Sequence, residues 1–281
     1  MSRPDARTGR VRSATRAQDK AMLEAVIFDL DGTLVDTEQT GHRVAFNEAF
    51  EHFGIDDHWD RDTYRALLAV TGGERRLRTW FADERSTATT LGEPARQDLA
   101  ARIHAWKTAR FADMATSGGL QARAGVGNLL DELVADRVRI AVATTGSRTW
   151  VDPLLDTTFG ARRFEVVVTG DDVLDRKPNP EAYWLTLRLL GVPAHVVVAV
   201  EDSGPGFRAA RAAGTAVVVV TNDESDLDEV SGGDLVVGGY GPGAKVVADP
   251  CGVWKPRQGL TAAALRTLHS RWSDRPATSG P

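Results

Sequence analysis

The stretch that decides the fold is AVIFDLDGT, residues 25–33, a short apolar run that ends in two aspartates and a glycine. The apolar part is continuous rather than alternating, which is typical of a strand buried on both faces of a parallel sheet. Similar runs follow at 138–143, 164–168, 196–200 and 216–220, with a shorter one at 235–237. Helical patterns at 126–135, 180–190 and 206–213 separate most of them. This order predicts an α/β fold with a parallel sheet.

The interval between the first two strands, residues 37–123, is too long for one crossover helix. It holds only helical candidates, at 42–53, 64–69, 74–82 and 95–115. We therefore predict an α-helical cap domain, residues 37–123, inserted into a core domain made of residues 22–36 and 124–240. Residues 241–281 form a predicted C-terminal extension with a Gly/Pro-rich stretch and a helix near 261–272.

Composition excludes several classes of protein. The 281 residues are 42% hydrophobic and 26% charged, which is typical of globular chains. The net charge of -5 argues against nucleic acid as a partner, and no apolar run approaches the roughly 18 residues that span a bilayer. The single cysteine, Cys251, excludes an internal disulfide and thiolate metal clusters, and fits a reducing compartment. We expect a cytoplasmic monomer without a membrane partner, preceded by a disordered head or over-long start at residues 1–21.

Polar residues gather where the predicted strands end, which is the edge at which parallel sheets bind ligands. Asp29 and Asp31 follow the first strand, and Glu201 with Asp202 follows the strand at 196–200. A single Asp-x-Asp-Gly is as consistent with an ordinary turn, but a second carboxylate pair at another strand end favours a site. Two such charges about 4 Å apart repel by roughly 4 kcal/mol at an effective dielectric near 20, so the pocket requires a cation.

The donor types indicate which cation and which substrate. Oxygen ligands without histidine or cysteine favour Mg²⁺, which commonly shares its shell with a phosphate oxygen. The Thr144 hydroxyl and the backbone N–H groups of Thr145 and Gly146, with Ser147 next to a helix start, form a predicted anion cradle. Lys177, before a Pro-x-Pro turn, adds a positive charge.

These residues suggest a phosphoryl-transfer mechanism. An aspartate can attack phosphorus and so divide hydrolysis into formation and breakdown of an aspartyl-phosphate. Asp29 is the predicted nucleophile. Asp31, two residues further, points to the same side and is the predicted general acid and base. Mg²⁺ and Lys177 would offset the charge on the transferring phosphoryl group.

The chain resembles the haloacid dehalogenase (HAD) superfamily of phosphohydrolases, whose Rossmann-like core carries four motifs. They appear in order as FDLDGT (28–33), ATTG (143–146), KPNP (177–180) and VEDSGPG (200–206). The resemblance implies Asp29 as nucleophile and Asp31 as acid/base. It also implies Mg²⁺ bound by Asp29, the Asp31 backbone carbonyl and Asp202, with Glu201 in or next to the shell. True dehalogenases of the superfamily lack the second aspartate, so Asp31 favours phosphate chemistry.

The insert resembles that of the CbbY-type, β-phosphoglucomutase-like branch, in GHRVAFN (41–47) and LLAVTGGERR (67–76). That branch is associated with dephosphorylating sugar phosphates, in particular xylulose 1,5-bisphosphate. Arg75 and Arg76 are the predicted second-phosphate site, because they follow a Gly-Gly turn at a helix start.

The other predicted substrate contacts of the insert are Glu38, His42 and Lys107, its only lysine. The sequence departs from the branch at one point: Glu74 and Arg75 stand where it usually has Lys-Glu, which rearranges the charge at the second-phosphate site. The expected function is a Mg-dependent sugar-phosphate phosphatase. The alternatives are a β-phosphoglucomutase-type mutase, with the same core, and a non-catalytic phosphosugar-binding protein.

Overall fold

The computed structural model describes residues 22–70, 72–160 and 162–274. The predicted head, residues 1–21, and the last seven residues of the predicted extension lie outside this part of the chain. The elements are, in chain order, β1 (Ala25–Phe28), η1 (Glu38–His42), α1 (Arg43–His52), α2 (Arg61–Leu67), α3 (Gly73–Phe81), η2 (Thr87–Thr90), α4 (Glu93–Thr116), α5 (Val126–Ala135), β2 (Arg139–Ala143), α6 (Arg148–Phe159), β3 (Val166–Val168), α7 (Glu181–Leu190), η3 (Ala194–Val196), β4 (Val197–Glu201), α8 (Gly204–Ala212), β5 (Ala216–Val220), α9 (Leu227–Val230), β6 (Leu235–Val237), β7 (Val246–Ala248) and α10 (Ala262–Ser273).

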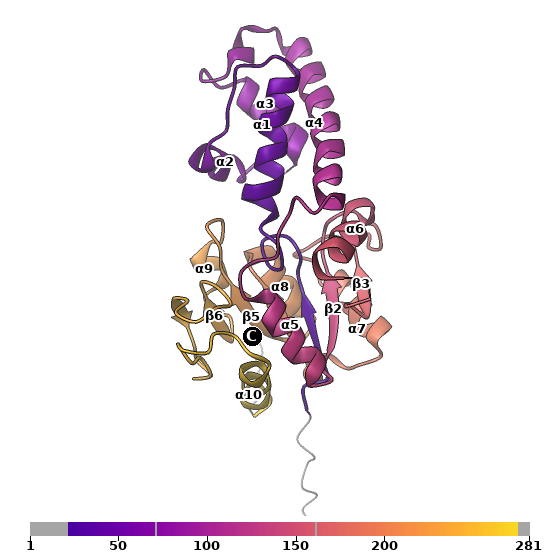
Figure 1. The fold of residues 1–281 in the computed structure, drawn as a ribbon. Coiled ribbons are helices and arrows are strands. Elements are labelled where there is room, and N and C mark those ends of the chain that lie inside the picture. The colour runs from indigo at the N-terminus through magenta and orange to yellow at the C-terminus, as the bar shows by residue number, and fades with distance from the viewer. Residues whose placement is uncertain (1–21, 71, 161, 275–281) are drawn as a thin grey trace, which may run out of the picture.

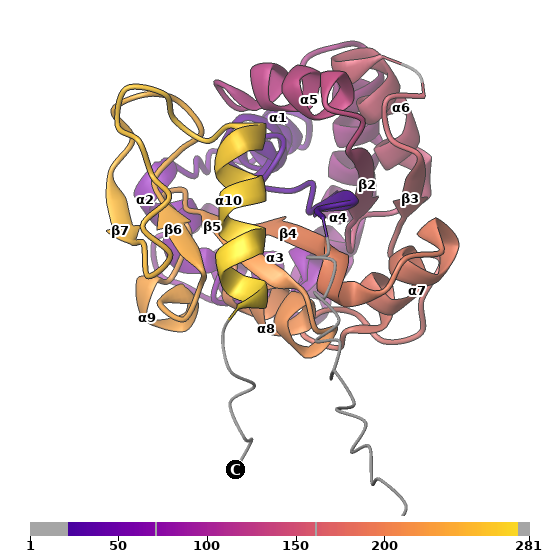
Figure 2. The same cartoon turned by 90° about the horizontal axis from the view of Figure 1, so that it is seen from below.

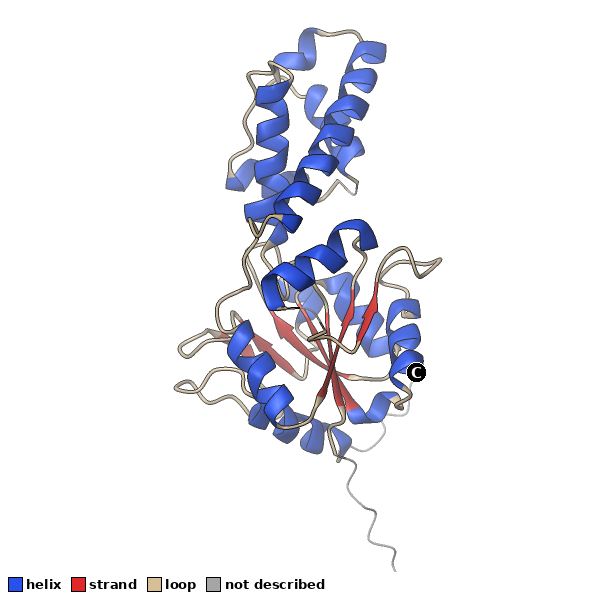
Figure 3. Ribbon diagram, turned by 45° about the vertical axis from the view of Figure 1, so that its right-hand side comes forward, coloured by secondary structure: helices blue, strands red, loops and turns tan. Residues whose placement is uncertain are grey.

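The strands form one sheet (Figures 1 and 3), and their order in it is β3-β2-β1-β4-β5-β6-β7. Every pairing is parallel except β6 with β7. Phe28, the last residue of β1, is in register with Val142 of β2 and Val200 of β4, so these strands end along one edge. The predicted α/β class with a parallel sheet is confirmed.

Helices cover both faces of the sheet because its strands are apolar on both sides (Figure 2). On one face Val26, Phe28 and Val142 share a buried cluster with residues of α5, α6 and α10. On the other face Ile27 and Ala141 share a cluster with residues of α7, α8 and α9. The result is a three-layer core.

The insert leaves the core after β1 and returns before α5, and it stands over the carboxyl edge of the sheet (Figure 1). Its own core is strongly aromatic and includes Phe46, Trp59, Tyr64 and Trp80. Asp60 caps α2 by accepting a hydrogen bond from the Thr63 backbone N–H at 2.7 Å. The four helices predicted for residues 37–123 correspond to α1, α2, α3 and α4, whereas the domain bounds themselves remain a prediction.

Some strands differ from the expected elements in their bounds or were not predicted. β1 ends at Phe28, directly before Asp29, and β4 runs to Glu201 rather than ending at residue 200, so Glu201 is the last residue of a strand. Within the predicted extension, Val246–Ala248 form an antiparallel edge strand that was not predicted, because its three apolar residues lie in a Gly/Pro-rich stretch. α10 docks through buried Leu265 and Leu268.

None of the helices in the described residues is long and apolar enough to cross a membrane.

Candidate active site

Three buried carboxylates meet at the carboxyl edge of the sheet. Asp29 follows β1, Glu201 ends β4, and Asp202 comes next in the chain. The Asp29 backbone N–H donates to the Val200 carbonyl at 2.9 Å, which fixes the two strand ends together. One oxygen from each carboxylate lies within 4.8 Å of the others. Parallel pairing of β1 with β4 thus unites motifs that are more than 170 residues apart.

Lys177 is the cation that the structure places among these carboxylates. Its Nζ donates to Asp29 Oδ1 and to Glu201 Oε1, both at 2.6 Å. The Tyr183 hydroxyl also donates to Glu201 Oε1, at 2.5 Å. Burial opposes the charged form of Lys177, but the two carboxylates outweigh it and raise the pKa of Lys177 above its ordinary value. Burial raises the pKa of Glu201 to about 7, against the opposing effect of Lys177.

The remaining donor atoms fit a hard cation. Glu201 Oε2 is buried and has no hydrogen-bond partner among the described residues. A buried acceptor without a partner is costly, so a ligand at this atom would remove an energetic penalty. Asp202 is oriented by Thr33 Oγ1 at 3.0 Å and by Asn222 Nδ2 at 2.7 Å. Asp29, Glu201 and Asp202 are therefore a donor set that suits Mg²⁺.

The Asp31 side chain lies apart from that donor set. Its Oδ1 accepts from Thr37 Oγ1 at 2.6 Å, and its Oδ2 accepts from Thr144 Oγ1 at 3.2 Å. Burial, followed by the neighbouring Asp29 charge, raises the pKa of Asp31 to about 7. A carboxyl group with such a pKa can both hold and release a proton near neutrality. The predicted role of its backbone carbonyl as a metal ligand remains a prediction.

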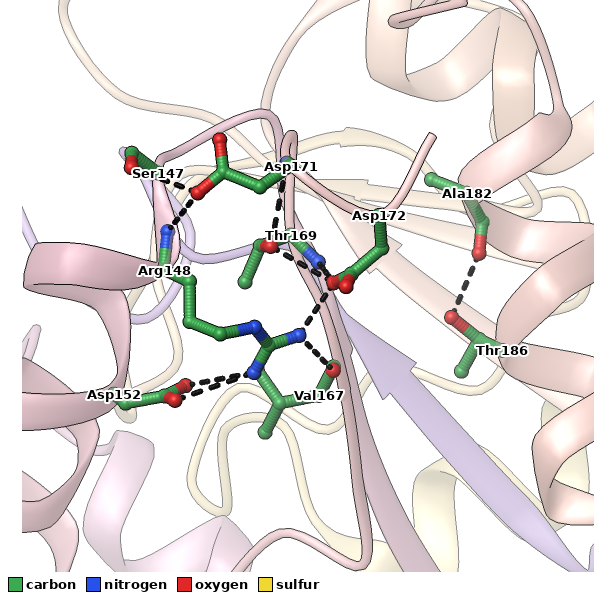
Figure 4. Close-up of polar contacts among 9 residues, drawn as sticks. All are labelled: Ser147, Arg148, Asp152, Val167, Thr169, Asp171, Asp172, Ala182 and Thr186. Atoms are coloured by element: carbon green, nitrogen blue, oxygen red, sulfur yellow. Dashed lines mark hydrogen bonds and ion pairs between the residues drawn. The ribbon is translucent and has the colours of Figure 1, made fainter. Parts of the chain in front are cut away.

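The predicted anion cradle is only partly open to a ligand in this structure. Thr144 is buried, and its hydroxyl accepts from the Gly146 backbone N–H at 3.0 Å. Among the described residues, the Thr145 N–H has no acceptor. The Ser147 hydroxyl, predicted to contact substrate, donates instead to Asp171 Oδ2 at 2.8 Å (Figure 4). The Thr145 N–H is therefore open to a phosphate, whereas the Gly146 N–H would have to exchange its bond to Thr144 for one to the phosphate.

Several predicted residues of the insert do gather in one place. The Tyr64 hydroxyl donates to Glu38 Oε2 at 2.7 Å, and Arg76 Nη1 lies 3.2 Å from the same hydroxyl. Lys107 Nζ lies 2.8 Å from His42 Nδ1. Burial lowers the pKa of Lys107 to about 8, while the Glu38 and Asp31 carboxylates oppose the shift. Burial also lowers the pKa of His42, and Lys107 adds to that effect, so a neutral ring accepts from Lys107.

Arg75 does not join this group, although it neighbours Arg76 in sequence. Arg75 is exposed and lines a cavity of about 330 Å³ together with Arg78 and Arg96. Arg76 is buried and donates to the Leu67 carbonyl at 3.0 Å. Neighbouring positions of α3 are turned by about 100° about the helix axis, so the pair cannot face one ligand side by side. The structure separates the predicted arginine pair.

Six residues of the site were not predicted: Thr33, Thr37, Tyr64, Arg123, Tyr183 and Asn222. Arg123 donates to the carbonyls of Gly32 (2.5 Å), Val220 (2.9 Å) and Thr221 (2.7 Å). Asn222 follows β5 at the same edge as the other site residues, so the strand-end rule applied to the fifth strand would have found it. Arg123 and Tyr183 carry no such signal in the sequence.

Comparisons with known proteins agree with this geometry. The model of the haloacid dehalogenase-like hydrolase family matches residues 26–220. Protein CbbY of Cereibacter sphaeroides is 40% identical over 222 residues, 78% of this chain and 93% of that protein. A phosphorylated carbohydrates phosphatase of Thermotoga maritima is 31% identical over 218 residues, 76% of this chain and 94% of that protein.

A solved structure of CbbY from Rhodobacter sphaeroides, a variant in complex with xylulose-(1,5)bisphosphate, is 38% identical with a TM-score of 0.62, and the alignment covers 78% of this chain and 95% of that chain. These findings confirm the resemblance to CbbY-type proteins that the motifs predicted. Because the family model spans most of the sheet and all four motifs, the chain belongs to the haloacid dehalogenase-like hydrolase family.

Proposed function

We propose that this phosphoric monoester hydrolase is a Mg-dependent sugar-phosphate phosphatase that acts through a phosphorylated Asp29, on a sugar bisphosphate such as xylulose 1,5-bisphosphate. The observation that carries the proposal is the group formed by Asp29, Lys177, Glu201 and Asp202, whose side chains converge at one strand edge. The sugar bisphosphate bound to the similar CbbY structure supports the class of substrate.

The first half-reaction follows from the two aspartates. Lys177 donates a hydrogen bond to Asp29 Oδ1, and a carboxylate oxygen of Asp29 attacks phosphorus as the bond to the sugar oxygen breaks. Asp31, with a pKa of about 7, gives its proton to the departing oxygen. Thr37 and Thr144 hold the Asp31 carboxyl in place for this transfer.

The second half-reaction releases the phosphate. Asp31, now ionised, takes a proton from water as the water oxygen attacks the phosphorus on Asp29. The bond between phosphorus and Asp29 then breaks, and inorganic phosphate leaves with the nucleophile restored. Asp29, Glu201 and Asp202 would hold the magnesium ion. When bound, the ion supplies positive charge that stabilises the phosphoryl oxygens.

The insert provides groups suited to the sugar and its second phosphate. Lys107 and Arg76 are buried cations, and Glu38 and His42 offer hydrogen bonds for hydroxyl groups. Because Arg76 lies with Glu38 and Arg75 does not, we assign the second-phosphate role to Arg76 alone. Its guanidinium also stacks on Tyr64 at 5.2 Å, which restricts where it can move.

A screen of sugar monophosphates and bisphosphates with Mg²⁺ tests the proposal. Release of phosphate from a bisphosphate, abolished in Asp29→Asn, is the expected result. Arg76→Ala should weaken turnover of the bisphosphate and spare p-nitrophenyl phosphate, whereas the neighbouring Arg75→Ala serves as the matched control. Equal losses of Arg76→Ala on both substrates would refute its role. Conversion of β-glucose 1-phosphate to glucose 6-phosphate without free phosphate would refute the hydrolase and support a mutase.

A further inference from the structure

A second loop braces the phosphate-binding loop from outside the site. The phosphate-binding loop is residues 144–147, between β2 and α6, and the bracing loop is residues 169–172, after β3. The Gly170 backbone N–H donates to the Gly146 carbonyl at 2.8 Å. A Cβ atom built on Gly170 would lie 2.3 Å from the Thr145 carbonyl oxygen, so the two backbones touch.

Asp171 makes the polar part of this contact (Figure 4). Its Oδ2 accepts both the Ser147 hydroxyl and the Arg148 backbone N–H, each at 2.8 Å. The Arg148 N–H is the first amide of α6, an end of the helix that favours negative charge. Asp171 thereby fixes the point at which the phosphate-binding loop turns into α6.

The bracing loop is itself tied to the core. Asp172 Oδ2 accepts the Thr169 backbone N–H and hydroxyl, both at 2.8 Å. The Arg148 guanidinium pairs with Asp172 and donates to the Val167 carbonyl at 3.2 Å, so it reaches back to β3 (Figure 4). Arg148 also lies 3.2 Å from each oxygen of Asp152, one turn along α6. The bracing loop is therefore held to α6 through Arg148, and Arg148 is held to β3 through the Val167 carbonyl.

We propose that Asp171 is a positioning residue for phosphoryl transfer, which holds residues 144–147 so that the Thr145 N–H faces the phosphoryl group on Asp29 while the Thr144 hydroxyl holds Asp31. Asp171 contacts neither the proposed substrate nor the carboxylates of Asp29, Glu201 and Asp202. It acts through its hydrogen bonds to Ser147 and Arg148. The inference rests on the proposed phosphatase activity. Small displacements of such donors cost rate because the donors must match the transition state.

The test compares Asp171→Ala with Asp171→Asn, using p-nitrophenyl phosphate and Mg²⁺. Asp171→Ala should lower kcat about tenfold with little change in KM, because the loop donors act chiefly in the transition state. Asp171→Asn keeps one carbonyl oxygen that can accept both hydrogen bonds, so it should restore most of kcat. Asp156→Ala, an exposed aspartate on α6 with no hydrogen bond to its side chain among the described residues, is the matched control and should equal the wild type.

A second variant disturbs the same contact from the other side. Gly170→Ala places a methyl group against the Thr145 carbonyl and should also lower kcat. Because Asp171 is exposed and accepts only one amide of α6, its replacement should leave the circular dichroism spectrum unchanged and lower Tm by only about 1 to 8 °C. An unchanged kcat in Asp171→Ala, or equal losses in Asp171→Ala and Asp171→Asn, would overturn the proposal.

The outcome is separable from that of the proposed function. If the protein hydrolyses p-nitrophenyl phosphate but no sugar phosphate, the proposed substrate class is wrong. The comparison of Asp171→Ala with Asp171→Asn on p-nitrophenyl phosphate still tests the positioning role of Asp171. If it hydrolyses neither, calorimetric titration with orthovanadate, which mimics the five-coordinate phosphorus of the transition state, and Mg²⁺ decides instead. Weaker binding in Asp171→Ala than in Asp171→Asn would support the positioning role, and equal binding in both would overturn it.

Discussion

Replacing Lys177 by methionine tests how much its charge contributes to the stability of the fold. Lys177 pairs with the carboxylates of Asp29 and Glu201. The substitution keeps the length of the side chain and removes its charge. Lys177, Asp29 and Glu201 have side-chain exposures of 5%, 9% and 0%, so solvent screens the interaction little. At 2.6 Å and an effective dielectric near 20, each pair attracts by about 6 kcal/mol before desolvation is subtracted.

The net effect on stability is smaller, because burying Lys177 costs desolvation that the variant avoids. Removing one partner of a buried ion pair typically costs about 3 to 5 kcal/mol. For a domain of this size we expect Tm to fall by about 6 to 20 °C. The measurement is thermal and urea unfolding in EDTA, followed by circular dichroism. Lys245→Met, at an exposed lysine with no partner for its side chain among the described residues, is the matched control.

The loss should also depend on pH in a defined direction. Lys177 holds down the pKa of Glu201, which burial nevertheless raises to about 7, so the variant should raise that pKa further. A carboxyl whose folded pKa lies above its unfolded value stabilises the fold at low pH and loses that contribution as pH rises. Wild type and variant lose this contribution in parallel up to about pH 7, so the difference in Tm between them should grow as pH rises above 7. Equal stabilities at pH 8, or a difference that shrinks as pH rises, would refute the electrostatic account.

Three further predictions follow from contacts at or near the site. Gly206→Ala should abolish activity and lower Tm, because a Cβ there would lie 1.9 Å from Glu201 Oε2; an active variant with wild-type Tm would contradict this contact. Arg123→Met should lower kcat and stability together, because three backbone carbonyls lose their donor; the check is steady-state kinetics beside urea unfolding, and unchanged values in both would exclude a structural role. Asp60→Ala should cost about 0.5 to 2 kcal/mol by removing the cap of α2, with Asp60→Asn restoring most of it in the same unfolding assay; equal losses in the two variants would show that the cap does not matter.

The sheet was predictable because its strands are buried on both faces. Burial makes each run apolar throughout, as in AVVVV at 216–220, and such runs stand out from their surroundings. The edge strand β7 has exposed valines and lacks that contrast, so it was missed. β7 also lies in a segment whose glycine and proline residues predicted only turns.

The convergence of the site carboxylates could also be predicted from the sequence, because parallel pairing puts the carboxyl ends of all strands at one edge of the sheet. Asp29, Glu201 and Asp202 needed no more than that rule. The rule gives no information about residues between strands. Tyr183 lies on α7 and Arg123 in the segment that returns from the insert, and their contacts depend on how α7 and the insert pack on the core.

The sequence by itself determined the order of the elements, the insertion of a helical segment and the identity of the four motifs, since each depends on local pattern or on the strand-end rule. Tertiary structure alone decided which of two neighbouring arginines lies with Tyr64 and Glu38, because the packing of α3 buries Arg76 and exposes Arg75. It alone also joined Asp171 to Ser147, residues 24 positions apart whose contact depends on the approach of two loops. Local pattern reports burial and strand ends, whereas side-chain direction is set by packing between elements.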